Sequence, residues 1–435
     1  MRSINPATEE VIAEYEAFDE ARIDRALELS IERYSEWRGT SFEDRSELMR
    51  RAGEILRERC EEWAQLMTAE MGKPIRSARS EVNKCAWVCD FYADHAERFL
   101  APELITTDAK LSMRRFDPLG PILAVMPWNF PFWQVFRFAA PYLMAGNTGL
   151  LKHAGNTQGS ALAIEEIFLE AGFPEGVFQT LVVESDAVAG IIHDDRVRGV
   201  TLTGSERAGR AVGKAAGEAL KPSVLELGGS DPCIILADAD IEAAAETAAL
   251  SRLINNGQSC IAAKRFIVVK ESYEDFVDAF RAALESRVMG DPTSEETDIG
   301  PQAREDLRDE LHDQLERSLQ GGATCVLGGE IPRQKGYYYP ATLLLDVKPG
   351  MAAFDEEVFG PIAPVIRAED EQDAVALANR SDLGLGASLW TRDFDRALSI
   401  VPRIESGHVA VNGIVKSDPR LPFGGIKNSG YGPNS

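Results

Sequence analysis

The amino-acid sequence predicts an α/β protein whose parallel sheet has helices on its faces. From Gly120 onward, short apolar segments typical of strands alternate with longer segments that have the apolar periodicity of helices. Neighbouring parallel strands need long crossover connections, and helices of this length provide them. The chain has 435 residues, of which 44% are hydrophobic and 27% charged. This length exceeds that of one ordinary core and indicates two or three domains.

The first hundred residues precede this alternation. Residues 1–18 contain a turn and then alternating apolar and polar residues, which predicts a short edge hairpin. Amphipathic periodicity predicts long helices at 19–37, 42–71 and 76–99, and the glycine and proline of Met71–Pro74 separate the last two. Residues 111–116 alternate like an exposed strand that stands outside the neighbouring folds.

Between Gly120 and residue 230, the pattern predicts a Rossmann-like, dinucleotide-binding sheet. Its expected strands are 122–125, 149–152, 177–183 and 199–203. Its expected helices are 132–145, 157–171, 185–193 and one that ends near Leu220. A second α/β set follows Asp231–Pro232, with expected strands at 266–269, 324–327, 339–347 and 409–413 and helices near 272–288 and 303–319.

Composition excludes several classes of function. The net charge is −24, from 46 basic and 70 acidic side chains, which argues against a nucleic-acid partner. No apolar run is long enough to span a bilayer and the N-terminus has no signal-peptide core, so we expect no membrane partner and a cytoplasmic location. Six cysteines in so long a chain do not form a disulfide framework, and no zinc-type spacing predicts a metal site.

Cys260 is the first candidate for catalysis. It ends the polar run Asn255–Ser259 and precedes the strand at 266–269. A single cysteine is most often a small buried hydrophobe. However, Glu226 lies in an apolar strand that ends on two glycines, where a dry carboxylate is expected to have a raised pKa. A thiol and a carboxylate base together suit covalent catalysis at a carbonyl carbon.

Asn129 is a candidate for the third catalytic function. It lies between Pro127 and Pro131, on a rigid, non-helical turn after an apolar strand. A fixed side-chain amide can donate a hydrogen bond to the oxyanion that forms when a thiolate attacks a carbonyl.

Five motifs resemble those of the aldehyde dehydrogenase superfamily, in its order, and are closest to bacterial succinate-semialdehyde dehydrogenases. They are Pro127–Pro131, Leu225–Gly229, Gly257–Cys260, Glu357–Pro361 and Pro422–Gly430. The resemblance implies that Cys260 attacks an aldehyde, that Asn129 and the Cys260 N–H bind the oxyanion, and that hydride passes to a nicotinamide. Glu226 would activate the water that hydrolyses the thioester. Because a free thiol has a pKa of about 8.5, the site must lower that pKa or use Glu226 as the base.

The resemblance also implies a domain organisation and an assembly. A dinucleotide-binding domain is expected at 1–100 and 119–230, and a catalytic domain at 231–412. An oligomerisation arm and C-terminal tail are expected at 101–118 and 413–435, with a tail shorter than is usual in the family. The expected assembly is a homodimer or a homotetramer.

The implied cofactor is NAD or NADP. The usual Gly-x-Gly-x-x-Gly fingerprint is absent, and Gly204 and Ser205, followed by Gly209, open a helix instead. By itself this turn reads as a plain capped helix start, but the resemblance makes it a pyrophosphate site. The remaining residues of the predicted cofactor site are Trp128, Lys152, Gly155, Leu227, Glu357 and Phe359.

Gly155 is a departure that bears on the choice of cofactor. Many NAD-preferring relatives carry a glutamate three residues after the lysine that matches Lys152, and that glutamate repels a 2′-phosphate. Here the position is glycine, with Lys152 and His153 nearby. The sequence therefore permits NADP.

The predicted substrate is succinate semialdehyde. Arg137, on the helix after the Asn129 turn, matches a carboxylate-binding arginine of that branch, and Phe130 and Phe423 would line the same pocket. A second arginine that some members carry is Ile254 here, and Arg137 could instead form a surface ion pair. The alternatives are another aliphatic or aromatic aldehyde, a coenzyme A-acylating relative, a thiol hydrolase and a non-catalytic relative.

Overall fold

The computed structural model describes residues 1–432. The chain begins with an antiparallel hairpin of β1 (Arg2–Ile4) and β2 (Val11–Glu14), which confirms the predicted edge hairpin. Four helices follow: α1 (Glu20–Trp37), α2 (Phe42–Glu58), α3 (Cys60–Met71) and α4 (Ile75–Phe99). Asp19 caps α1, and Ser41 forms a capping box with Asp44 at the start of α2.

The single helix predicted at 42–71 is wrong, because the structure breaks it at Arg59. This residue has φ −108° and ψ 25°, outside the helical range. Its guanidinium forms ion pairs with Glu62, Glu166 and Glu170, so tertiary contacts with α6 (Gln158–Glu170) accompany the break. No glycine or proline marks the position, and sequence periodicity therefore runs through it.

A six-stranded sheet forms the first half of the molecule, in the order β19-β9-β8-β5-β6-β7. Its strands are β5 (Pro121–Val125), β6 (Thr148–Lys152), β7 (Phe178–Thr180), β8 (Gly199–Thr203), β9 (Ser223–Glu226) and β19 (Gly430–Tyr431). All pairings are parallel except that of β19 with β9. This confirms the predicted α/β fold, although β7 is shorter than the strand expected at 177–183.

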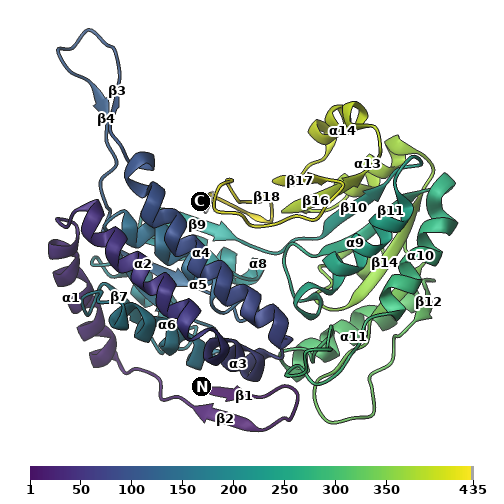
Figure 1. Cartoon of the computed structure of the whole chain (residues 1–435), viewed down its shortest axis with the longest axis horizontal. Helices are drawn as coiled ribbons and strands as arrows, with labels where there is room; N and C mark the ends of the chain where they lie inside the picture. The colour runs from purple at the N-terminus through teal and green to yellow at the C-terminus, as the bar shows by residue number, and fades with distance from the viewer. Residues whose placement is uncertain (433–435) are drawn as a thin grey trace.

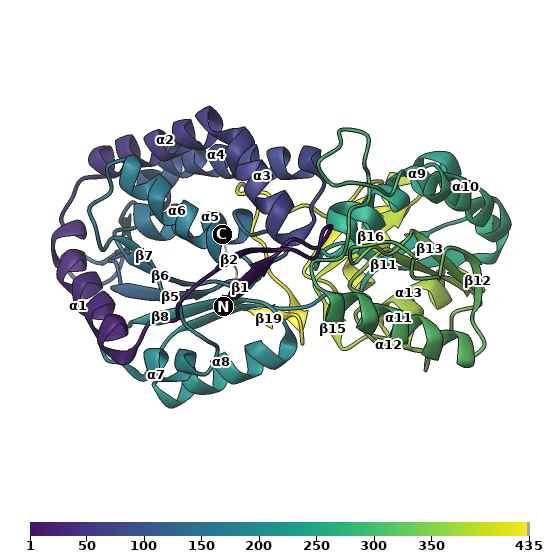
Figure 2. The same ribbon diagram turned by 90° about the horizontal axis from the view of Figure 1, so that it is seen from below.

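Helices cover both faces of this sheet, and each face has its own apolar core. Figure 2 shows α2, α4, α6 and α5 (Trp133–Met144) on one face and α7 (Ala187–His193) and α8 (Glu206–Glu218) on the other. The carboxyl ends of β5, β6, β8 and β9 come to one edge of the sheet, which is where a parallel sheet binds ligands.

A seven-stranded sheet forms the second half, in the order β12-β13-β14-β11-β10-β16-β17. Its strands are β10 (Asp231–Ile235), β11 (Ala263–Val269), β12 (Thr324–Leu327), β13 (Thr342–Leu345), β14 (Ile362–Ala368), β16 (Gly386–Trp390) and β17 (His408–Val411). Its helices are α9 (Ile241–Leu253), α10 (Tyr273–Glu285), α11 (Glu305–Gln320), α12 (Ala352–Asp355), α13 (Glu371–Asn379) and α14 (Phe394–Ile400). The chain crosses from the first sheet to the second between Glu226 and Asp231, and it returns to the first sheet between β17 and β19.

A small hairpin of β3 (Glu103–Leu104) and β4 (Met113–Arg114) projects from the body of the molecule (Figure 1). The strand predicted at 111–116 is reduced to two residues here. Residues 413–432, which the sequence prediction assigns to the arm and tail, contain β18 (Ile426–Lys427), which pairs with β15 (Leu383–Gly384), and β19, which pairs with β9. Residues 433–435 of that prediction lie outside the described part of the chain, and the division into domains stays a prediction. Within residues 1–432, no helix is both long and apolar enough to cross a bilayer.

Candidate active site

A cleft of about 620 Å³ lies where the two sheets meet, and residues from both line it. Trp128 and Asn129 come from the turn after β5, and Gly204 and Ser205 from the turn after β8. The second half contributes the loop that carries Cys260 and the segment that follows α12. Among the predicted site residues, those that line the cleft are Trp128, Asn129, Gly204, Ser205, Leu227, Cys260, Glu357 and Phe359.

The loop that carries Cys260 has an unusual backbone. Asn255 and Asn256, in the short 3-10 segment Ile254–Gly257, have positive φ values of 54° and 59°. Residues other than glycine rarely adopt this left-handed backbone conformation, and asparagine is among those that tolerate it best. Both amides are buried: Asn255 Nδ2 donates to the carbonyls of Asn129 at 2.6 Å and Gln258 at 3.1 Å, and Asn256 Nδ2 donates to that of Gly72 at 2.9 Å. Tertiary hydrogen bonds therefore hold the loop in a conformation that its local sequence disfavours.

Burial raises the pKa of the Cys260 thiol to about 12, while the charges of Lys264 and Arg137 act in the opposite direction. The thiol is therefore protonated at neutral pH and needs a base before it can attack a carbonyl. Of the two alternatives that the sequence left open, a lowered thiol pKa or deprotonation by Glu226, the structure favours the second.

Glu226 ends β9, and its residue is 2% exposed. Burial raises the pKa of this carboxyl to about 7, and the charge of Arg137 lowers it by a smaller amount. This confirms the raised pKa predicted from its place in an apolar strand. Its Oε1 atom is buried and has no hydrogen-bond partner within residues 1–432. A carboxyl with this pKa and a free buried oxygen is suited to accept a proton at neutral pH.

Asn129 is buried on the turn that the two prolines delimit. Its Nδ2 donates to the Gln258 carbonyl at 3.1 Å, which leaves the second N–H of the amide available to a ligand. The turn is anchored from behind by Glu81, whose Oε1 accepts from the N–H groups of Phe132 at 3.0 Å and Trp133 at 2.9 Å. Glu81 also pairs with the buried Lys73. The Asn129 amide is therefore held through its Nδ2 atom, and the turn that carries it is held by Glu81.

Arg137 is buried in α5, so its alternative interpretation as a surface ion pair is wrong. Its residue is 6% exposed, and its guanidinium donates to Thr203 Oγ1 at 3.2 Å. The guanidinium carbon lies 5.0 Å from the centre of the Phe423 ring. No ion pair of Arg137 forms in the described part of the chain. Phe130, the other predicted pocket residue, is half-buried and packs against Lys73, whose Nζ lies 4.0 Å from the ring centre.

Lys152 and Gly155 lie at the end of β6, as predicted. Burial lowers the pKa of Lys152, and the nearby Glu184 opposes that effect. The atom nearest to a Cβ placed on Gly155 would be Met1 Cγ at 3.5 Å, so a side chain is sterically tolerated and the chain simply lacks a carboxylate there.

The expectation that His153 supports a 2′-phosphate is wrong. The residue is fully buried, and burial lowers the pKa of the imidazole to about 4. One ring nitrogen lies 3.0 Å from the Pro131 carbonyl and the other 2.8 Å from Thr157 Oγ1. A neutral imidazole with both nitrogens bound braces the Asn129 turn and has no atom left for a phosphate.

Gly204 and Ser205 precede α8, and Ser205 caps the helix by accepting from Ala208 N at 3.3 Å. The first-turn N–H groups of α8 form the kind of site that binds a phosphate oxygen. Gly209 lies within α8, where a Cβ would come within 2.5 Å of the Leu227 side chain. Gly209 therefore allows α8 to pack closely against Leu227 at the end of β9. This packing positions the turn that is proposed to bind phosphate.

Glu357 and Phe359 form the far end of the cleft. Glu357 Oε1 accepts from the Gly229 N–H at 3.1 Å and from Lys264 Nζ at 3.2 Å. A Cβ on Gly228 would come within 2.2 Å of Glu357 Oε2, so glycine is required for this approach. Phe359 meets Trp128 edge-on, with ring centres 5.8 Å apart. Since Gly204 and Ser205 share a cleft with these residues, the site fits an extended dinucleotide.

A model of the aldehyde dehydrogenase family matches residues 1–435, which is the whole chain. This protein belongs to the aldehyde dehydrogenase family. The match agrees with the resemblance that the five motifs carry and with the two-sheet α/β fold.

Similar members of the family include several succinate-semialdehyde dehydrogenases. A protein of Synechocystis sp. named "Probable succinate-semialdehyde dehydrogenase NADP(+)" is 50% identical over 430 residues, which cover 99% of this chain and 95% of that protein. The succinate semialdehyde dehydrogenase NAD(P)+ Sad of Escherichia coli K12 is 48% identical, with 99% and 93% covered. The crystal structure of succinic semialdehyde dehydrogenase from Streptococcus pyogenes in complex with NADP+ superimposes with a TM-score of 0.97, at 36% identity, and 99% and 95% of the two chains are covered.

Several residues of this aldehyde dehydrogenase site were not found from its sequence. Asn255, Glu81, Thr203 and Lys264 bind the catalytic elements from behind. Glu81 lies in a long amphipathic helix, where charged residues are normally solvated, and Lys73 lies in the glycine and proline break that precedes this helix. Lys264 alone carried a local signal, because it follows Cys260 by four residues at the start of a strand in which Arg265 is the one other charged residue.

Proposed function

We propose that this aldehyde dehydrogenase oxidises succinate semialdehyde to succinate, with NADP as the preferred cofactor. The names of its similar relatives support both the substrate and the cofactor. The residues proposed for catalysis are Cys260, Glu226 and Asn129.

One observation supports the substrate most strongly: the buried Arg137 guanidinium has no anionic partner within residues 1–432. An unpaired buried cation is costly, and a ligand carboxylate that binds it removes much of that cost. Arg137 interacts electrostatically with both Cys260 and Glu226, so its charge acts beside the reacting atoms. A four-carbon semialdehyde places its carboxylate at the guanidinium and its aldehyde at the thiol.

The reaction begins when the Cys260 thiol gives its proton to Glu226 and the sulfur bonds to the aldehyde carbon. The carbonyl oxygen takes up the negative charge and receives hydrogen bonds from the Asn129 amide and the Cys260 N–H. When bound, the nicotinamide supplies the hydride acceptor that turns this adduct into a thioester. Glu226 releases to solvent the proton that it took from the thiol, and then takes a proton from water, whose oxygen attacks the thioester carbon. The Cys260 thiolate is expelled and takes this proton back from Glu226. The products are succinate and the free thiol.

Lys152 and Gly155 support NADP. Lys152 is a cation at the end of β6, where a ribose lies in dinucleotide-binding sheets, and Gly155 presents no carboxylate to a 2′-phosphate. Gly204 and Ser205 at the start of α8 would hold the pyrophosphate, and Glu357 the nicotinamide ribose.

We place the enzyme in the cytoplasm and infer a homodimer or homotetramer. Its six cysteines are free thiols, which fits a reducing compartment. The β3–β4 hairpin projects from the body with apolar side chains exposed, including Leu104 at 76% and Leu111 at 65% (Figure 1). An exposed apolar hairpin of this kind is expected to be covered by another subunit.

The experiment that tests this proposal compares succinate semialdehyde with butanal, its uncharged analogue, using NADP and NAD in parallel. A guanidinium–carboxylate contact should favour the semialdehyde by about tenfold to a hundredfold in kcat/KM. Arg137→Ala should remove that preference and leave butanal oxidation within about threefold of the wild-type rate. Equal oxidation of both aldehydes by the wild-type enzyme would contradict the proposal that succinate semialdehyde is the substrate.

A further inference from the structure

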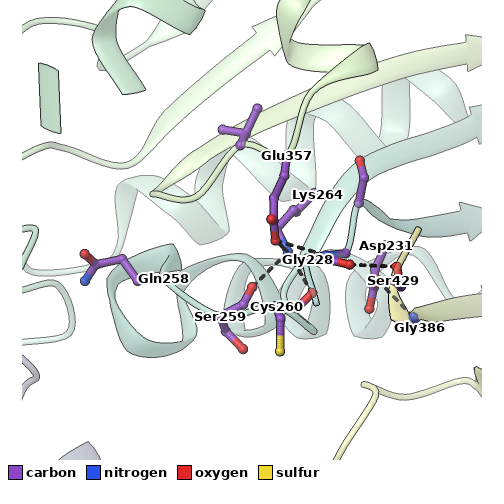
Figure 3. A network of polar contacts seen from close by, with 12 residues as sticks. Gly228, Asp231, Gln258, Ser259, Cys260, Lys264, Glu357, Gly386 and Ser429 are labelled. Carbon is purple, nitrogen blue, oxygen red and sulfur yellow. Dashed lines mark hydrogen bonds and ion pairs between the residues drawn. The ribbon is translucent and has the colours of Figure 1, made fainter. Parts of the chain in front are cut away.

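Lys264 lies directly behind the nucleophile. It is the second residue of β11, its side chain is 1% exposed, and its Nζ donates to the Ser259 and Cys260 carbonyls at 2.8 Å each. Figure 3 shows the ammonium on one side of the loop and the Cys260 sulfur pointing to the other. A buried cation that binds two backbone carbonyls of a catalytic loop restrains that loop more strongly than a neutral donor does.

The Ser259 carbonyl belongs to the same peptide unit as the Cys260 N–H. A trans peptide is planar, so its C=O and N–H point in opposite directions, and the structure contains no cis peptide within residues 1–432. Because Lys264 and the Ala262 N–H hold the Ser259 oxygen on one side, the Cys260 N–H must face the other. That is the side of the thiol, where the oxyanion forms. No acceptor in the described chain takes this N–H.

The same ammonium is tied to the predicted cofactor end of the cleft. Lys264 Nζ lies 3.2 Å from Glu357 Oε1, and the Gly229 N–H holds the same oxygen. Gly229 also faces the Cys260 carbonyl, since a Cβ there would come within 2.5 Å of that oxygen. One cation therefore joins the carbonyls of the nucleophile loop to the carboxylate proposed to bind the nicotinamide ribose (Figure 3).

We propose that Lys264 is a positioning residue for aldehyde oxidation, which turns the Cys260 N–H toward the oxyanion and orients the Glu357 carboxylate for the cofactor. This inference rests on the proposed aldehyde dehydrogenase activity. It predicts that Lys264 acts on the transition state, since the oxyanion is absent from the bound aldehyde.

The first test is Lys264→Met, which keeps the length of the side chain and removes the ammonium. With succinate semialdehyde and NADP, kcat should fall by about a hundredfold while KM for the aldehyde changes by less than about threefold. Lys264→Arg keeps a buried cation with several donors and should recover about tenfold of the lost kcat. A purely structural role would not produce this split between kcat and KM together with rescue.

The second test separates oxyanion binding from cofactor binding. Hydrolysis of p-nitrophenyl acetate acylates Cys260 through an oxyanion and needs no nicotinamide, whereas alkylation by iodoacetamide forms no oxyanion. Lys264→Met should slow ester hydrolysis by about a hundredfold. It should slow alkylation by about tenfold at most. Equal losses in the two reactions would overturn oxyanion positioning.

The matched control is Lys221→Met. Lys221 Nζ also donates to two backbone carbonyls, those of Ile192 and Asp194 at 2.5 Å each, but it lies after α8 and outside the cleft. It should change neither kcat nor ester hydrolysis by more than about twofold. Circular dichroism and thermal unfolding establish that each variant is folded. If Lys264→Met is not folded, the same kinetic tests are made with Lys264→Gln.

The outcomes are distinguishable. A folded Lys264 variant that keeps wild-type kcat and ester hydrolysis within about threefold would overturn the positioning role. If the wild-type enzyme hydrolyses the ester in a Lys264-dependent manner but does not prefer succinate semialdehyde, the substrate proposal fails while the positioning role stands.

Discussion

Glu226 and Glu357 are two glutamates that interact electrostatically with the same cysteine and have opposite surroundings. Glu226 ends a strand of the first sheet, is buried, and has a carboxyl oxygen without a partner. Glu357 belongs to the second half and accepts from Lys264 and from the Gly229 N–H. Burial without partners makes the first a proton acceptor near neutral pH, while paired donors make the second a fixed ligand-binding carboxylate. The environment, and not the residue type, assigns each role.

The largest expected effect is that of Glu226→Gln. The amide cannot accept a proton, so kcat for succinate semialdehyde should fall by about a thousandfold or more. Because the Cys260 thiol loses its proton to Glu226 and thioester hydrolysis needs the same base, pre-steady-state absorbance should show a slowed first burst of reduced cofactor and no turnover beyond it. The control is Glu165→Gln, since Glu165 is half-buried and burial raises its pKa, yet it accepts from the Thr180 N–H at 2.9 Å away from the cleft. A Glu226→Gln variant with wild-type kcat would assign the base elsewhere.

Gly155→Glu introduces a carboxylate at the predicted adenosine end of the site. Its charge should repel a 2′-phosphate, so kcat/KM for NADP should fall by about tenfold to a hundredfold while that for NAD changes little. The space around Gly155 admits a Cβ, so the fold should be unaffected. Gly155→Gln is the uncharged control of the same size. An equal loss with both substitutions would mean that side-chain size, and not charge, sets the preference.

Glu357→Gln should act mainly on the cofactor, in contrast to Glu226→Gln. It leaves Lys264 without its carboxylate and weakens the contact proposed for the nicotinamide ribose, so KM for NADP should rise by about tenfold. Initial rates at varied NADP measure this. Glu371→Gln is the control, because Glu371 also lies between two cations, Arg396 and Arg403, but outside the cleft. A burst without turnover in Glu357→Gln would contradict the division of roles.

The smallest expected effect is on stability. The pKa of Glu226 is raised by burial to about 7, so the folded state binds more protons than the unfolded state between about pH 4.5 and pH 7. The associated stability is present below that range and is lost as pH rises through 7. Between pH 4.5 and pH 8 the free energy of unfolding of the wild-type protein should therefore decrease through this group. In Glu226→Gln that decrease should be smaller by up to about 3 kcal/mol. Denaturant unfolding at both pH values measures it, and an unchanged difference would contradict the raised pKa.

Much of the fold and the catalytic centre followed from local patterns. Strand and helix periodicity predicted the α/β class, and the proline pair around Asn129 and the two glycines after Glu226 marked rigid turns at strand ends. Such features act over a few residues, so the sequence displays them directly. The break at Arg59 was missed because its ion pairs join residues that are distant in the sequence. The strand at 111–116 was predicted too long because its pairing with β3 covers only two residues, which local periodicity does not reveal.

His153 and Lys264 illustrate what local patterns cannot decide. Both are basic residues within four positions of a predicted functional residue, His153 beside Lys152 and Lys264 after Cys260. Tertiary packing buries His153 in its neutral form behind the Asn129 turn and places Lys264 between Cys260 and Glu357. The surroundings of each charge come from segments far apart in the chain.

The amino-acid sequence by itself determined the α/β class, because short-range periodicity encodes it. It also contains the motifs that resemble the aldehyde dehydrogenase family and that include Cys260, Glu226 and Asn129. Only the tertiary structure decided that Glu226 has a pKa near neutrality, that Arg137 is a buried cation without a partner, and that Lys264 holds the Ser259 carbonyl. Those properties depend on desolvation and on distances between distant segments, and both arise only when the two sheets pack together.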